Sequence, residues 1–130
     1  MKTWLRFSTV FSLLAAAAFG AGVARIAPAE AAKRVAAGDA VLVDVREPNE
    51  WKESGVAAPA VLLPKSDFDG EKQEWTPFLR ANRGKEILLY CRSGHRAGIV
   101  AKALAEEGYR VANAGGFREW KDAGLPVKKP

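Results

Sequence analysis

Stretches of apolar residues alternate with polar, turn-forming stretches through most of the chain, and their lengths predict the secondary structure. Continuous apolar runs rich in valine and leucine are typical of strands that are buried on both faces of a sheet. Such runs predict three strands, at residues 40–45, 60–64 and 86–91, and we expect a fourth strand at residues 109–116. Apolar residues at helical spacing, or proline and glycine at the ends of a segment, predict helices at residues 28–37, 76–82, 97–109 and 117–124.

The order of these elements predicts a fold of the α/β class. Strands that alternate with helices form a parallel sheet with helices on both faces. Residues 46–51, which follow the first strand, contain Pro48 and Asn49 and are predicted to form a loop. Cys91 ends the third strand, and ligands of open α/β sheets bind outside the carboxyl ends of the strands. We therefore expect the functional site beside Cys91.

The first 24 residues differ from the rest and are predicted to form a secretory signal peptide. A positively charged start precedes a short apolar stretch and then small residues. This order is typical of signals that are removed during export, and cleavage after Gly20 or after Ala24, within the window Ala18–Ala24, satisfies it. The apolar stretch is shorter than the ~20 residues that a spanning helix needs, so a stable membrane anchor is the weaker interpretation. We expect a protein that is periplasmic or otherwise exported and whose domain covers residues 25–130.

Composition narrows the classes of function. The chain of 130 residues is long enough for one compact domain. Its formal charge of +5 comes without a long basic run or a basic patch interleaved with aromatic residues, which argues against nucleic acid as a partner. Cysteine and histidine each occur once, as Cys91 and His95, which is too few for a typical zinc site. An unpaired cysteine in an exported protein is a reactive group, a site of intermolecular pairing or an inert core residue.

The residues around the cysteine favour the reactive interpretation. Arg92 and Arg96 bring positive charge, and the helix that follows turns its positive dipole end toward the loop. Ser93 and Gly94 permit a tight turn that aims main-chain N–H groups inward, as in an anion-binding nest. Together these influences favour a thiolate, the nucleophilic form of cysteine. A role of His95 as a base is a weaker alternative, because neighbours in a tight loop often point outward.

Three motifs in a fixed order make the chain resemble the rhodanese family of sulfurtransferases. They are "DVREP", which begins at Asp44, "YCRSGHR", which contains the cysteine, and "GGFREW" followed by "AGLPV" near the end. The resemblance covers nearly all of the domain, and the small exported form is similar to the periplasmic phage-shock rhodaneses. It implies a three-layer fold with a central five-stranded parallel sheet and helices on both faces.

The resemblance also implies an enzymatic cycle. Cys91 is expected to attack the outer sulfur of thiosulfate or a similar small anionic donor and to hold that sulfur as a persulfide. A thiophilic acceptor such as cyanide, a thiol or a thiol-containing protein is then expected to take the sulfur. The cycle needs no cofactor and no metal.

Roles for the neighbouring residues follow from the same resemblance. Arg92 and Arg96 are expected to orient the anionic donor, and the main-chain amides of residues 93–96 to stabilise the persulfide. Asp44 and Arg46 match a family pair whose role is mainly structural, a polar brace near the cysteine loop.

One stretch departs from the family pattern. Family members often read Gly-His-Ile-Pro-Gly-Ala where this chain has "GVAAPA" at residues 55–60. Val56 therefore stands in place of a histidine, and Pro59 in place of a glycine. The departure concerns the packing of that turn and any polar role of the histidine, and it leaves the cysteine loop untouched.

Two other functions rank below sulfur transfer. Phosphatases and arsenate reductases of the same fold carry one residue more between the cysteine and the arginine, whereas here four residues separate Cys91 from Arg96. The shorter ring of amides suits a single sulfur better than a tetrahedral oxyanion. A non-catalytic binding module of the same fold is the other alternative, but such modules commonly lack the cysteine.

Overall fold

The computed structural model of the protein describes residues 23–130, so nearly all of the predicted signal peptide lies outside the described residues. Four parallel strands form the central sheet, in the order β3-β1-β4-β5. They are β1 (Ala40–Asp44), β3 (Val61–Leu62), β4 (Glu86–Cys91) and β5 (Val111–Gly116). The predicted α/β class and parallel sheet are confirmed.

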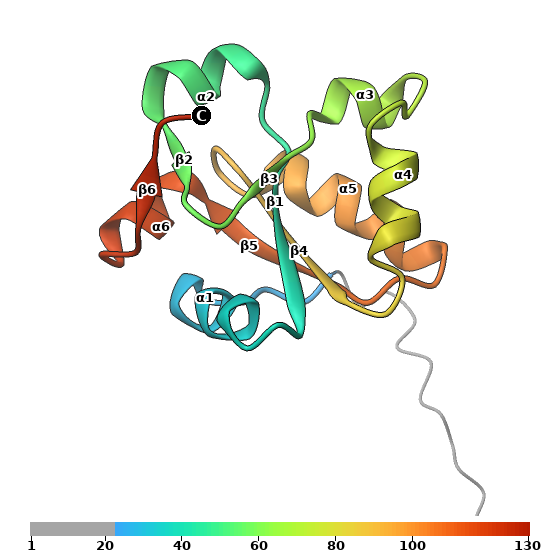
Figure 1. The fold of residues 1–130 in the computed structure, drawn as a ribbon, viewed down its shortest axis with the longest axis horizontal. Coiled ribbons are helices and arrows are strands. Elements are labelled where there is room, and N and C mark those ends of the chain that lie inside the picture. The colour runs from blue at the N-terminus through green and yellow to red at the C-terminus, as the bar shows by residue number, and fades with distance from the viewer. Residues whose placement is uncertain (1–22) are drawn as a thin grey trace, which may run out of the picture.

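Helices cover both faces of this sheet (Figure 1). One face carries α3 (Lys65–Asp69), α4 (Trp75–Ala81) and α5 (His95–Glu106). The other face carries α1 (Pro28–Ala36) and α6 (Phe117–Asp122). The domain therefore has the three layers that the alternation of strands and helices predicts.

The central strand β4 sends its side chains alternately into the two halves of the core. Successive side chains of a strand point to opposite faces. Ile87, Leu89 and Cys91 pack on the side of α5, while Leu88 and Tyr90 pack on the side of α1 and α6. All five are at most 1% exposed, which places the end of β4 at the centre of the molecule.

Within residues 23–130 the sheet has four strands, one fewer than the five expected. In place of a fifth strand, a single parallel bridge joins Arg25 to Asn113 of β5. The Ile26 N–H donates to the Asn113 carbonyl (3.0 Å), and the Asn113 N–H donates to the Ala24 carbonyl (2.9 Å). This segment is too short to be a strand because Pro28 begins α1 directly after it.

The loop expected at residues 46–51 is instead the start of a helix, α2 (Pro48–Ser54). Pro48 occupies the first helical turn, where its missing N–H costs nothing. The Glu47 N–H donates to Glu50 Oε1 (3.2 Å), as in a capping box. The loop prediction was wrong because proline and asparagine are typical of helix starts as well as of turns.

The turn at residues 55–60 packs through a short antiparallel ribbon. Its strand β2 (Val56–Ala57) pairs with β6 (Val127–Lys128). Val56 is fully buried, and the Ala57 N–H donates to the Tyr90 hydroxyl (3.0 Å). The turn that departs from the family pattern is thus fixed to the central strand by its main chain.

The strand predicted at residues 60–64 is reduced to β3 at the edge of the sheet. Val61 is 39% exposed, so this strand is not buried on both faces as its apolar sequence suggested. Among the helices that lie within residues 23–130, none is long and apolar enough to cross a membrane.

Candidate active site

Cys91 lies at the carboxyl end of β4, where the chain turns into α5. The pairing of β4 with β5 shifts register between Leu89 and Cys91, and such irregularities often re-aim a side chain next to an active site. The residue is 0% exposed and belongs to the core on the side of α5. Because burial alone would also suit an inert core cysteine, the groups that contact the sulfur decide between the two interpretations.

The sulfur of Cys91 accepts a main-chain hydrogen bond. The Gly94 N–H donates to Sγ across 3.0 Å. Gly94 has φ +98°, a conformation that favours glycine, and it is the N-cap of the 12-residue helix α5. The sulfur therefore lies near the positive end of a helix dipole and beside an inward N–H, both of which stabilise negative charge.

The cysteine loop is packed backbone to backbone against the turn between β5 and α6. A side chain at Gly116 would collide with the Arg92 carbonyl. A side chain at Gly94 would collide with the Arg25 guanidinium and would also lie 3.3 Å from Gly115 Cα. Close approach to the loop thus explains Gly116 of the "GGF" motif, whereas Gly115 has φ +83° and a side chain there would meet the Glu119 carboxylate.

The two arginines of the loop are placed differently. Arg92 is exposed and has no ion-pair partner among the residues that the structure describes. Arg96 is half-buried and donates from Nη1 to Glu50 Oε1 (2.6 Å) and from Nη2 to Oε2 (2.9 Å). These hydrogen bonds lower the pKa of Glu50 from 4.5 to about 2 and raise the pKa of Arg96. A guanidinium has five N–H donors, so Arg96 keeps donors beyond those that bind Glu50.

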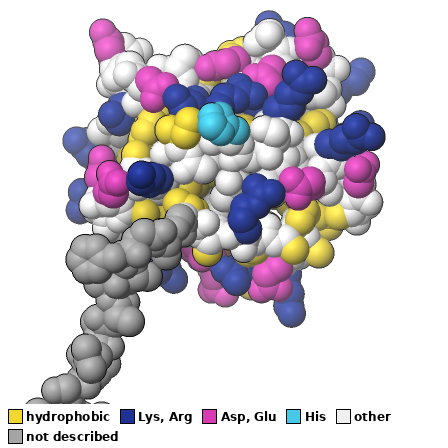
Figure 2. All heavy atoms as spheres, turned by 180° about the vertical axis from the view of Figure 1, so that it is seen from behind, with side chains coloured by type: hydrophobic (Ala, Val, Ile, Leu, Met, Phe, Trp, Pro, Cys, Tyr) yellow, Lys and Arg dark blue, Asp and Glu magenta, His cyan; other side chains and the backbone are white. Residues whose placement is uncertain are grey.

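The side chain of His95 is exposed, and Figure 2 shows the imidazole at the surface beside lysine and arginine side chains. An exposed imidazole next to a buried thiol is poorly placed to act as its base. The His95 N–H makes only a long bond, 3.4 Å, to Ser93 Oγ. As the first residue of α5, His95 has no helical partner for this N–H.

Asp44 and Arg46 form a buried ion pair at the end of β1, with side chains 0% and 3% exposed. Arg46 donates from Nε to both carboxylate oxygens (3.1 Å each) and from Nη2 to Oδ2 (2.8 Å). Its other bonds reach Ser54 Oγ (2.7 Å) and the Gly55 carbonyl (2.8 Å), and the guanidinium lies over the Phe117 ring (4.4 Å). Burial lowers the pKa of Arg46, but the bonds and charge of Asp44 outweigh it, and the net pKa is raised. The pair joins the end of β1 to the end of α2.

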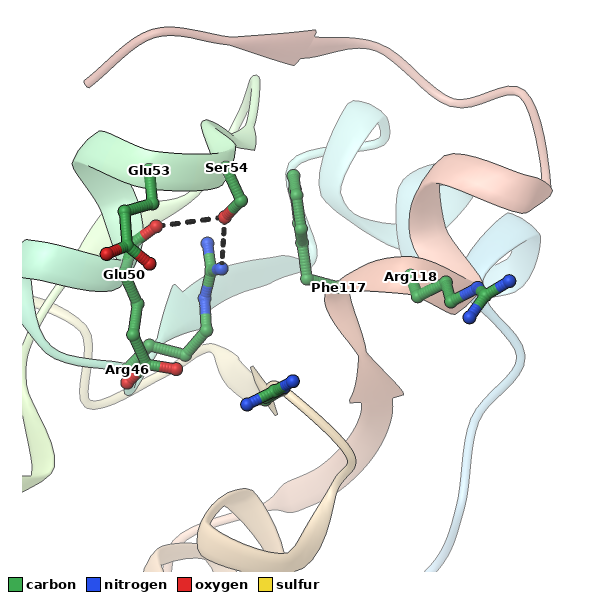
Figure 3. A pocket seen from close by; sticks show the side chains of 7 residues that line it. Arg46, Glu50, Glu53, Ser54, Phe117 and Arg118 are labelled. Carbon is green, nitrogen blue, oxygen red and sulfur yellow. Dashed lines mark hydrogen bonds between the residues drawn. The ribbon is translucent and has the colours of Figure 1, made fainter.

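A pocket of about 300 Å³ opens beside the cysteine loop (Figure 3). Basic, acidic and aromatic side chains line it, namely Arg46, Glu50, Glu53, Ser54, Arg92, Phe117 and Arg118. In Figure 3, Arg118 lies on the far side of Phe117 from Glu50 and Ser54. Arg46 is paired with Asp44 and Glu50 with Arg96, so Arg92, Arg118 and Glu53 are the other charged side chains of this lining.

Several pocket residues could not be recognised from the sequence. Glu50 and Arg96 are 46 positions apart in the sequence, so no local sequence pattern predicts their contact. The only signal is the position of Glu50 two residues after Pro48, which is the N3 position of a helix. Within the described part of the chain, no group of three or more His, Cys, Asp or Glu side chains could hold a metal ion.

Comparison with protein families gives a match to the rhodanese-like domain over residues 27–123. That range includes every residue of the candidate site. Among solved structures, a rhodanese-related protein of Thermoplasma volcanium superposes with a TM-score of 0.68 at 24% identity. The superposition covers 82% of this chain and 99% of that one, and it shows the likeness of fold.

Curated relatives are similar over most of the domain. A sulfurtransferase of Allochromatium vinosum is 33% identical over 71% of this chain and 81% of its own length. The thiosulfate sulfurtransferase GlpE of Coxiella burnetii is 31% identical over 75% of this chain and 86% of its own. The protein slr1261 of Synechocystis is 35% identical over 68% of this chain, which spans only 47% of that relative's length.

Proposed function

The chain belongs to the rhodanese-like family, and from this premise we propose that it is a thiosulfate sulfurtransferase that carries sulfur as a persulfide on Cys91. The observation that carries the proposal is the hydrogen bond from the Gly94 N–H to Cys91 Sγ at the start of α5. A thiol held by a main-chain donor at a helix N-terminus is prepared for negative charge. Related sulfurtransferases support the same class of reaction.

The proposed cycle has two displacements at sulfur. The Cys91 thiolate attacks the outer sulfur of thiosulfate, the S–S bond of the donor breaks, and sulfite leaves with the bonding electron pair. Cyanide or a thiolate then attacks the outer sulfur of the persulfide, and the Cys91 thiolate is restored. Charge and electrons balance in both steps, so no cofactor and no metal is needed.

Arg92 and the main-chain amides have separate roles in this proposal. Arg92 meets the sulfonate end of the donor from the rim of the pocket, and Arg96 contributes through the donors that Glu50 leaves unused. The Gly94 N–H holds Sγ of Cys91, and the His95 N–H stabilises the outer sulfur of the persulfide. Because Cys91 is fully buried in this conformation, the proposal also requires the loop to open for the donor.

A mass spectrum of the purified protein after thiosulfate treatment tests the function. We expect an adduct of one sulfur atom, lost on addition of cyanide with release of thiocyanate. Cys91→Ser should remove the adduct and reduce turnover to background, because the chain has no other cysteine. Turnover by the serine variant would refute the persulfide. A wild type that neither forms the adduct nor turns over any sulfane donor would favour the binding-module alternative.

We also propose that residues 1–24 direct export, so that the enzyme works in the periplasm on small anions and thiols. The mature protein should begin between Ala21 and Arg25 and should be recovered with the periplasmic fraction. The same mass spectrum reports its first residue. Recovery of the full-length chain in the cytoplasm alone would contradict export and leave the proposed chemistry intact.

A further inference from the structure

Asn113 connects the cysteine loop to the neighbouring strand β5. Its side chain is almost buried, with the residue 7% exposed. Nδ2 donates to the Gly94 carbonyl (2.8 Å), and Oδ1 accepts from the Gly115 N–H (2.9 Å). Since both ends of the amide are used, its orientation is fixed by its partners.

The backbone of Asn113 is also firmly held. It pairs with Leu89 of β4 on one side and with the segment around Arg25 on the other. The amide packs against the first turn of α5, where a side chain at Gly98 would lie 3.3 Å from Nδ2. A side chain anchored on a central strand in this way can hold a loop in one geometry.

The bond to Gly94 has a consequence for the next residue. The Gly94 carbonyl and the His95 N–H belong to one trans peptide unit, so they point in opposite directions. This carbonyl accepts from the Gly98 N–H (2.9 Å) and, with its second lone pair, from Asn113. The His95 N–H is therefore turned away from Asn113 and has only its long bond to Ser93 Oγ.

We propose that Asn113 is a positioning residue for sulfur transfer. By holding the Gly94 carbonyl, it keeps the His95 N–H directed at the outer sulfur of the persulfide, while the Gly94 N–H holds Sγ of Cys91. Asn113 itself touches neither sulfur and acts only through the peptide between Gly94 and His95. This inference rests on the proposed function.

Two substitutions distinguish this positioning role from a general effect on the folding of the loop. Asn113→Leu has nearly the same shape and removes both amide bonds. Asn113→Ser is too short to reach Gly94, but its hydroxyl can still accept from the N–H two residues later, so it preserves the local turn. The matched control is Asn82→Ser, because Asn82 Nδ2 also donates to a helical carbonyl, that of Phe78 (2.9 Å), at the end of α4.

Three quantities are measured for each variant: the rate of sulfur loading from thiosulfate, KM for thiosulfate, and the rate of alkylation of Cys91 by iodoacetamide. In both Asn113 variants we expect sulfur loading and kcat to fall about tenfold, since a misplaced donor group loses much of its effect. KM should change less than about twofold, because Arg92 is untouched. Alkylation should stay unchanged or become faster, because the loop is less firmly held. Asn82→Ser should match wild type in all three.

Loading that stays within twofold of wild type in a folded variant would overturn the inference. Loading and alkylation that fall in parallel would also overturn it, since that pattern indicates a generally damaged loop. If Asn113→Leu does not fold, the serine variant decides by the same criteria. If the wild type never loads sulfur from any sulfane donor, both the proposed function and this inference are wrong. If the wild type loads normally and the Asn113 variants load equally well, only this inference is wrong.

Discussion

Two loops leave the neighbouring parallel strands β1 and β4 at their carboxyl ends, and the loops differ in how their charges and main-chain groups are used. The loop after β1 is fixed by side chains: the Asp44–Arg46 pair is buried, and Arg46 also bonds to Ser54 and Gly55. Within the loop after β4, the Gly94 N–H bonds to the sulfur of Cys91, and side chains of other elements, Asn113 and Glu50, hold the loop from outside. The charged side chains of the first loop, Asp44 and Arg46, pair with each other. The second loop has an exposed arginine, Arg92, and the N–H of His95 at the start of α5.

The comparison distinguishes residues that hold the site in place from groups that can bind an anion. A buried ion pair is stable only when its donors and acceptors are satisfied, and a satisfied pair is rigid. Such a pair cannot bind a substrate anion, because its charge is already neutralised. Main-chain N–H groups at a helix start can bind an anion because the helix leaves them without partners. The loop after β1 is thus suited to a rigid supporting role, and the neighbouring loop after β4 to the binding of an anion.

The largest effect on stability is expected at the first loop. Arg46→Ala leaves the Asp44 carboxylate buried without its partner, and breaking such a pair costs about 3–5 kcal/mol. Urea unfolding monitored by circular dichroism should show a free energy of unfolding lowered by that amount. Arg34→Ala is the control, since Arg34 also binds carboxylates but is exposed, and its loss should be far smaller. Equal losses for the two variants would refute the contrast.

At the second loop the expected effect is on catalysis. Arg96→Ala removes charge-assisted contacts at the donor site, so kcat/KM for thiosulfate should fall roughly ten- to a hundredfold, chiefly through a higher KM. Its stability should change much less than that of Arg46→Ala. Lys128→Ala, which removes a positive charge that does not line the pocket beside the cysteine loop, should leave the kinetics unchanged. Equal small effects from Arg96 and Lys128 would mean that only overall charge matters.

A smaller effect, on the pH dependence of stability, connects the two loops. The pKa of Glu50 is about 2 in the folded protein, against an ordinary 4.5, because Arg96 binds its carboxylate. Its contribution to stability is therefore complete above about pH 4.5 and is lost as the pH falls toward 2. Glu50→Gln should reduce the slope of unfolding free energy against pH in this window. The control Glu53→Gln, on the same helix, should keep the slope of the wild type, and an unchanged slope in both variants would contradict the assignment.

The same comparison shows what the sequence could predict. Long apolar runs predicted β1 and β4, because most side chains of a strand buried on both faces are apolar. The region around Cys91 was recognised from its neighbours along the chain. The short strands β2 and β6 were missed because they are distant in sequence and stabilise each other by pairing, as Val56 does with Lys128.

The polar contacts of the site were harder to predict than its cysteine. Nothing in the sequence predicts that Arg96 forms an ion pair with Glu50, because the two residues come together only when α2 packs near the start of α5. Asn113 reads as one residue of an apolar strand, and its role is visible only through its bond to Gly94. Local sequence thus predicts where a nucleophile lies, but tertiary packing decides which side chains surround it.

The proposed removal of the signal peptide would affect the main-chain pairing beside β5. The Asn113 N–H donates to the Ala24 carbonyl, and Arg25 bridges to Asn113 and packs against Gly94. A signal peptidase that cut after Ala24 would discard that acceptor and leave a new, mobile amino group beside the residue that supports the cysteine loop. Cutting after Gly20 leaves the edge complete. If the chain is cut as we propose, a mature protein that keeps Ala24 therefore holds the main chain of Asn113 by one hydrogen bond more than a protein that begins at Arg25.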